Sequence, residues 1–122
     1  MSTARLFRSF AIAGSGFSRA WSTQPNLRLE TFIGIGALAL AAWLRAPAAP
    51  ILLACMCVIA LELMNSAIEA AIDLVSPDHH PLAGKAKDLA AAAVLTAAVG
   101  AVIVGLVVIG PPLLAKLGGA VG

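Results

Sequence analysis

The central part of the chain reads PILLACMCVIALELMNSAIEAAIDLV from Pro50 to Val75. Its first half is apolar throughout, and a helix needs roughly 20 apolar residues to cross a bilayer. Its second half carries polar side chains at spacings of three, four and four, namely Glu62, Asn65, Glu69 and Asp73. This stretch therefore predicts a membrane-crossing helix with an acidic stripe toward its end.

The rest of the chain is nearly as apolar. Hydrophobic residues make up 61% of it and charged residues 11%, against about 45–50% and about 25% in soluble domains. These values exclude an ordinary soluble globule, and so much apolar surface also excludes intrinsic disorder. We expect an all-α integral membrane protein of one domain over residues 1–122, with three transmembrane helices at residues 28–46, 50–75 and 86–110.

Proline-rich segments separate these helices. Residues 45–50 (RAPAAP) and 76–81 (SPDHHP) predict turns, because proline lacks the N–H that continues a helix. By the same reasoning, Pro111 and Pro112 should end the third helix and leave residues 111–122 as a loose tail.

Residues 4–24 form an arm with a helical pattern. One face of the arm is apolar, through Leu6, Phe10, Ala13, Phe17 and Trp21. Another face is mostly basic or polar, through Arg5, Ser9, Ile12, Ser15 and Arg19. This pattern predicts an N-terminal amphipathic helix lying in the membrane surface, with arginines toward anionic head groups. A helix packed on the rest of the protein fits the same pattern.

The distribution of basic residues predicts the orientation. The net charge of +2 is too small for a nucleic-acid binder. The arm and the second turn hold six basic residues, whereas the other side holds two; the six are Arg5, Arg8, Arg19, Arg28, Lys85 and Lys87, and the two are Arg45 and Lys116. Because basic residues concentrate on the cytoplasmic side, the N-terminus and the acidic stripe should face the cytoplasm.

The stripe is the candidate site. Glu62, Asn65, Glu69 and Asp73 fall within roughly 80° of arc on one helix face. A carboxylate inside a bilayer costs several kcal/mol unless it is paired, solvated or metal-bound. A solvated helix end explains Asp73 but explains Glu62 poorly. Carboxylate and amide oxygens suit Mg²⁺ or Mn²⁺ rather than zinc, and a buried glutamate also suits a general base or a proton relay.

No common nucleotide motif accompanies the stripe. The residues alone therefore leave open an enzyme, a proton or cation carrier and a pore. Small residues are frequent in the third span and permit close helix packing, which together with the few buried side chains of three spans favours an oligomer.

The segment ELMNSAIEAAID (62–73) resembles the signature of the prokaryotic diacylglycerol kinase family, which includes undecaprenol kinases. The segments HPLAGKAKD (80–88) and AAAAVL (90–95) continue the similarity. The arm matches more loosely, through RLFRSF (5–10), Gly16 and NLR (26–28). The resemblance covers about residues 4–110.

This resemblance implies a homotrimer in the bacterial cytoplasmic membrane that transfers the γ-phosphoryl group of ATP to a lipid hydroxyl with Mg²⁺. It makes Glu62 the general base and Glu69 a metal ligand, with Asn65 and Asp73 in support. It assigns nucleotide contacts to Asp78, His79, His80, Lys87 and Asp88. It places Arg5 on phosphate or a lipid head group and Glu30 in the lipid site.

One position departs from the family pattern. Many members have a second metal-binding glutamate where this chain has Gln24, whose neutral amide oxygen coordinates Mg²⁺ more weakly. The chain also lacks tyrosine near His79. The substrate remains open between diacylglycerol and undecaprenol. A proton or cation carrier that uses the same stripe, and a non-catalytic scaffold, are the competing hypotheses.

Overall fold

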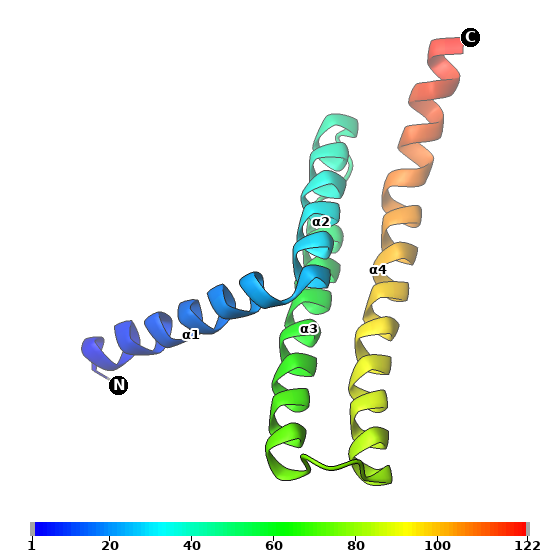
Figure 1. Ribbon diagram of the computed structural model, residues 1–122. Helices are drawn as coiled ribbons and strands as arrows, with labels where there is room; N and C mark the ends of the chain where they lie inside the picture. The colour runs from blue at the N-terminus through cyan, green and yellow to red at the C-terminus, as the bar shows by residue number, and fades with distance from the viewer. Residues whose placement is uncertain (1, 122) are drawn as a thin grey trace.

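The computed structural model describes residues 2–121 of the chain, with side chains described for residues 2–119. It holds four helices: α1 (Thr3–Thr23), α2 (Pro25–Leu44), α3 (Ala49–Val75) and α4 (Pro81–Val121). Helices α2, α3 and α4 pack into a narrow bundle in which α3 runs antiparallel to both α2 and α4. Helix α1 projects sideways from this bundle (Figure 1). The expectation of an all-helical chain is confirmed.

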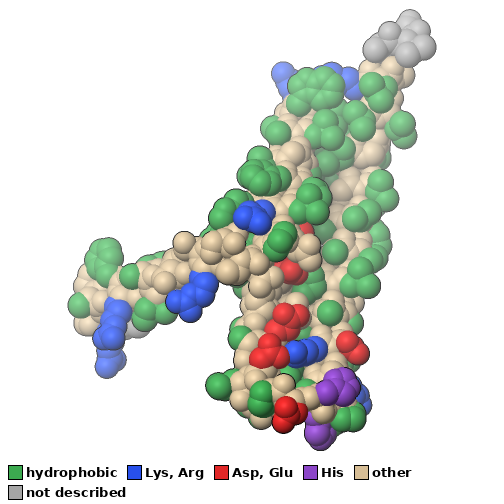
Figure 2. Space-filling view, viewed as in Figure 1, with side chains coloured by type: hydrophobic (Ala, Val, Ile, Leu, Met, Phe, Trp, Pro, Cys, Tyr) green, Lys and Arg blue, Asp and Glu red, His purple; other side chains and the backbone are tan. Residues whose placement is uncertain are grey.

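Three helices are long and apolar enough to cross a membrane, and they are α2, α3 and α4. Only a thin core lies between them, formed by Leu27, Ala41, Ile51, Val58 and Ala90. Most large apolar side chains instead point outward, over the whole length of the bundle (Figure 2). This pattern is typical of helices that face lipid or other membrane helices, and it supports the prediction of three spans.

The third long helix differs from the expectation at both ends. It starts at Pro81, where proline at the first helical position lacks only an N–H that would have no partner anyway. It also continues through Pro111 and Pro112 to Val121, so the prediction that these prolines end the helix is wrong. Membrane helices tolerate proline because neighbouring helices, polar side chains and local backbone adjustments satisfy the carbonyls that it frees, so a helix continuous across these prolines is consistent with a membrane span.

The other element bounds shift less. Helix α2 begins at Pro25, three residues before the expected start, because Pro25 again serves as a first helical residue. The turn after α2 lies where the RAPAAP segment predicted it, and Arg45 adopts a left-handed conformation there with φ 56° and ψ 31°.

The register of α2 against α3 determines where the polar stripe starts. Gln24, at the junction of α1 and α2, lines a groove together with Leu63, Ser66 and Ala70 of α3. Helix α2 therefore begins near the level of Ser66 and covers α3 only from there to the first turn. Beyond that level α3 continues for more than two turns to Val75, paired with α4 alone (Figure 1).

Helices α2 and α3 approach each other closely at Gly34. A methyl group at this position would lie 3.1 Å from Cys55 Sγ, whereas one at Gly36 would meet nothing within 4 Å. We expect Gly34→Leu to destabilise the bundle by about 1–3 kcal/mol through overpacking. Gly36→Leu is the matched control and should not destabilise it. Thermal unfolding in detergent micelles, followed by circular dichroism, measures both; equal melting temperatures would contradict this view of the contact.

Candidate functional site

The stripe on α3 begins with a buried carboxyl group. Glu62 is only 6% exposed and is the buried acidic residue of the described chain. Glu30 of α2 lies within electrostatic range of Glu62, so the two carboxylates repel each other when both are charged. Glu30 Oε2 is itself buried and accepts no hydrogen bond from residues 2–119. Two helices thus place carboxyl groups in one region. A proton, a cation or a hydrogen-bond donor bound there would stabilise them.

The next turn of α3 carries an amide and a second glutamate. Asn65 Nδ2 donates to Glu69 Oε1 over 3.4 Å. The amide oxygen of Asn65 is buried and has no partner within the described residues. Glu69, in contrast, is exposed. The pair therefore offers one free amide oxygen and one accessible carboxylate, which are oxygen ligands of the kind that Mg²⁺ prefers.

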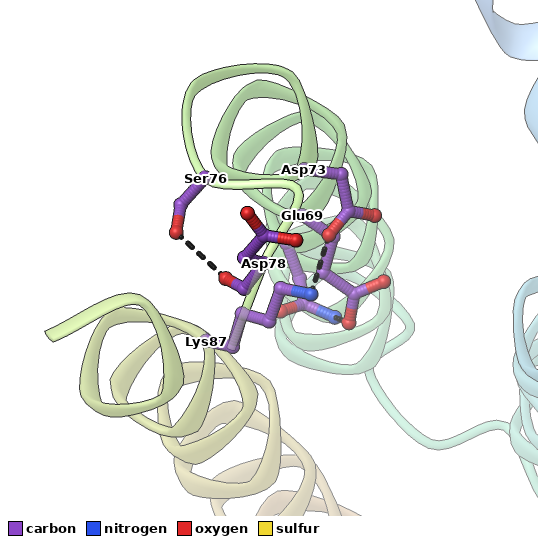
Figure 3. Close-up of polar contacts among 6 residues, drawn as sticks. Glu69, Asp73, Ser76, Asp78 and Lys87 are labelled. Atoms are coloured by element: carbon purple, nitrogen blue, oxygen red, sulfur yellow. Dashed lines mark hydrogen bonds and ion pairs between the residues drawn. The ribbon is translucent and has the colours of Figure 1, made fainter. Parts of the chain in front are cut away.

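A lysine from α4 completes this end of the stripe. Lys87 Nζ donates to Asp73 Oδ1 over 2.6 Å, and its charge is also attracted to Glu69. Figure 3 shows Lys87 reaching from α4 across to the face of α3 that carries Glu69 and Asp73. Both members of the ion pair are solvent-accessible, at 39% for Lys87 and 65% for Asp73. Water screens such a pair, so its net stabilisation is small, and Lys87 is free to exchange Asp73 for another anion.

The turn between α3 and α4 and the start of α4 hold the remaining candidate residues. Asp78, His79 and His80 are all exposed there, as is Asp88 on the second turn of α4. The Ser76 hydroxyl donates to the carbonyl oxygen of Asp78 over 3.0 Å and folds the turn back toward α3. His80 has a structural task that the sequence did not suggest, because its Nδ1 accepts the backbone N–H of Leu82 over 3.1 Å. It therefore caps the start of α4.

Two predicted site residues lie away from this cluster. Gln24 lies at the α1–α2 junction, on a flank of α3 beside Ser66 and Ala70 rather than on the stripe itself. Arg5 is near the free end of α1, where its backbone N–H donates to Ser2 Oγ. It is 19 positions from Gln24, or about 28 Å along a helix. Within residues 2–121, no three acidic, histidine or cysteine side chains converge on a metal-binding position.

Sequence reasoning missed a cavity between the three long helices. Its volume is about 290 Å³, and Glu30 is the only charged residue in its lining. The wall is otherwise apolar and includes Gly34, Cys55, Ala98 and Gly105. The small residues of the third span were read as a sign of close packing, but several of them leave this space open instead. Apart from Glu30, the lining of the cavity is apolar and suits a hydrocarbon chain.

The arrangement can now be compared with known proteins. A sequence profile described as prokaryotic diacylglycerol kinase matches residues 11–109. The chain belongs to the prokaryotic diacylglycerol kinase family. This confirms the resemblance drawn from the 62–73 and 80–88 segments.

Individual relatives carry two different substrate names. A diacylglycerol kinase of Synechocystis is 45% identical over 92% of this chain and 66% of its own length. The diacylglycerol kinase of Escherichia coli K12 is 35% identical over 81% of this chain and 84% of its own. The undecaprenol kinase of Bacillus subtilis is also 35% identical, over 89% of this chain and 91% of its own length. Both names describe kinases of lipid alcohols, the enzyme class that the resemblance implied.

The capping role of His80 can be separated from any role toward a ligand. We expect His80→Ala to weaken the first turn of α4 by about 1 kcal/mol, which speeds amide hydrogen exchange at Leu82 about fivefold. His80→Asn supplies another capping side chain and should restore the protection. Exchange measured by mass spectrometry on the two variants decides this, and equal rates in both would rule out the cap.

Proposed function

We propose that this chain is an ATP-dependent lipid kinase that phosphorylates the hydroxyl group of a membrane lipid alcohol, diacylglycerol or undecaprenol. One observation carries the proposal: the face of α3 changes from the buried Glu62 to the exposed Glu69 and Asp73 at the level where α2 begins. A lipid hydroxyl and a water-soluble nucleotide can meet only at such a boundary.

The membrane position follows from helix lengths. Helix α2 has 20 residues, which is about 30 Å of helix and matches the hydrocarbon core of a bilayer. Its start at Pro25 then marks the cytoplasmic boundary, and α1 lies along that boundary as an amphipathic surface helix. Glu62 falls about one turn inside the hydrocarbon, whereas Glu69, Asp73 and Lys87 fall outside it, in the cytoplasm. The count of basic residues supports the same orientation.

The chemistry assigned to Glu62 is proton transfer. Its carboxylate takes the proton of the lipid hydroxyl as the lipid oxygen bonds to the γ-phosphorus of ATP. The bond from that phosphorus to the bridging oxygen of ADP breaks at the same time, and ADP leaves. Transfer of this kind needs positioning and charge neutralisation rather than a covalent enzyme intermediate. Burial of Glu62 supports the role, because a desolvated carboxylate gains from accepting a proton.

Glu69 is the proposed ligand of Mg²⁺, with the free amide oxygen of Asn65 beside it and Gln24 as a weaker ligand. Mg²⁺ usually takes one or two protein carboxylates and completes its shell with water and substrate phosphates. The residues present therefore fit this ion although the described part of the chain gathers no cage of three acids. When bound, the ion would neutralise the charge of the ATP phosphates.

Nucleotide binding is assigned to the solvent-exposed turn end of the α3–α4 hairpin. Lys87 would leave Asp73 for a phosphate group, and Asp88, Asp78, His79 and His80 surround the same end. Asp73 would then keep Lys87 aligned when ATP is absent.

The lipid and the assembly complete the proposal. Glu30 and the adjoining apolar cavity would receive the part of the lipid next to its hydroxyl. The exposed apolar faces of α2–α4 support a homotrimer, and so does the distance of Arg5 from the stripe of its own chain. In a trimer, Arg5 would reach phosphate or a head group at a neighbouring subunit.

In the deciding experiment, purified protein is incubated with labelled ATP and with either diacylglycerol or undecaprenol. The lipids are then separated by thin-layer chromatography. We expect one labelled phospholipid product. Glu62→Gln should lower turnover by about 10²–10⁴-fold through loss of the base while ATP binding is retained. Glu69→Gln should instead weaken binding of Mg²⁺-ATP.

Ser66→Ala is the matched control, since it removes only a hydroxyl that donates to the Glu62 carbonyl oxygen over 3.1 Å; it should remain active. Full turnover by Glu62→Gln would refute the base assignment. Absence of any product, with ion flux into liposomes in its place, would support the proton or cation carrier.

Gln24 yields a separate prediction about the metal. Gln24→Glu adds a carboxylate at the α1–α2 junction, and ligand charge strengthens binding of hard cations. The Mg²⁺ concentration for half-maximal kinase activity should fall about three- to tenfold on this reasoning. Gln24→Ala should raise it, and an unchanged magnesium requirement in both variants would remove Gln24 from the metal site.

A further inference from the structure

The end of the bundle opposite the acidic stripe carries its own group of side chains. Lys116 of α4 places its Nζ 3.8 Å from the centroid of the Trp43 ring of α2. This distance is typical of a cation–π interaction, which holds the ammonium group over the ring face. Helix α4 extends past the α2–α3 turn at this end (Figure 1), so Lys116 connects its extension to the top of α2.

Arg45 stands at the same end in a conformation that arginine rarely adopts. It follows the last residue of α2 with φ 56° and ψ 31°. The Ala46 N–H donates to the Ala41 carbonyl oxygen over 2.8 Å, which closes the C-terminal motif of α2. Glycine or asparagine usually fills such a left-handed position, because a Cβ atom there is crowded. The backbone thus gains nothing from arginine, which leaves the exposed side chain of Arg45 available for another use.

Within residues 2–119, neither of these two cations pairs with an acidic side chain. The sequence holds no aspartate or glutamate from Thr31 to Leu61 or after Asp88. The one ion pair within the described residues joins Lys87 to Asp73 at the other end. Figure 2 likewise shows basic side chains at this end with no acidic side chain near them on the visible face. Arg45 is exposed, so its guanidinium group is open to an external anion.

We propose that Trp43, Arg45 and Lys116 form a binding site for the phosphate of an anionic phospholipid in the leaflet opposite the acidic stripe. The guanidinium group can bind phosphate oxygens through two N–H groups. Trp43 holds Lys116 at head-group depth, where tryptophan rings are enriched. Charge complementarity selects an anionic lipid, because the surface offers two positive charges and no negative one. The site is separate from the proposed kinase centre and does not depend on it.

The test reads the emission of Trp43 directly. Trp21→Phe removes the other tryptophan and keeps an aromatic ring against Phe17 and Phe32. This protein is placed in phosphatidylcholine vesicles that contain brominated phosphatidylglycerol or, in parallel, brominated phosphatidylcholine. Each basic residue near a membrane surface favours an anionic lipid about fivefold, so phosphatidylglycerol should quench Trp43 at a concentration at least fivefold lower.

Two variants and a control make the test specific. The preference should fall toward one in Arg45→Gly combined with Lys116→Gln, whereas Lys85→Gln at the opposite end should leave it unchanged. Arg45→Gly alone should weaken the preference but raise the melting temperature by a few degrees, because glycine suits the left-handed backbone. A purely structural role for Arg45 predicts no change in lipid preference.

Three results would overturn the proposal. The first is equal quenching of Trp43 by the two brominated lipids. The second is a preference that survives in the double variant. The third is a change of Trp43 emission on addition of millimolar inorganic phosphate to plain phosphatidylcholine vesicles that matches the effect of phosphatidylglycerol, since that would make the site one for small anions.

Discussion

A carboxylate inside a hydrocarbon layer must find water, a cation or a proton, and this requirement organises the whole chain. Glu62 is the buried acidic residue, and the structure limits its isolation by ending the cover of α2 about one turn away, near Ser66. Helix α3 is 27 residues long against 20 for α2. The difference of two turns is the segment that carries Glu69 and Asp73. A longer α2 would enclose these acids, and a shorter α3 would remove them.

The same geometry explains why the bundle is thin. Three helices of this length can bury few side chains among themselves, and here small residues permit one close approach at Gly34 and leave a cavity beside it. This close approach lies in the half of α3 that α2 covers, whereas α4 packs along both halves of α3. In the other half α3 packs against α4, where the solvent-screened Lys87–Asp73 pair adds little stability beside the capped start of α4 at His80. The exposed acids Glu69 and Asp73 lie in the half of α3 that α2 does not cover, and the buried Glu62 lies just inside the covered half. The candidate site spans the level where the two halves meet.

The sequence predicts the features of the fold that follow from periodic spacing. It does not predict features that depend on tertiary contacts or on residues that depart from their usual preferences. The three long helices and the shared face of Glu62, Asn65 and Glu69 follow from apolar runs and a spacing of about 3.6 residues per turn. Pro111 and Pro112 depart from the expectation because the rule that proline ends helices holds best in soluble proteins, whereas membrane helices tolerate proline where other groups satisfy the freed carbonyls. The tertiary contacts were out of reach, since no local pattern says that Lys87 faces Asp73 or that Lys116 lies over Trp43.

His80 and Arg45 show a different limit. Histidine is not among the preferred capping residues, and arginine is not a preferred residue for left-handed backbone. Each occupies a backbone position that other residues usually fill; the Nδ1 atom of His80 is used there as the cap, whereas the side chain of Arg45 is not needed for the turn. The proposed anionic lipid would give the exposed guanidinium group of Arg45 a partner. Arg5 also lacks a partner site within reach, for a different reason. It lies about 28 Å of helix from the junction with α2 and is too far away to reach the stripe of its own chain. A role for Arg5 in phosphoryl transfer therefore requires that the stripe it serves belongs to another copy of the chain, and the sideways projection of α1 from the bundle makes such sharing geometrically available.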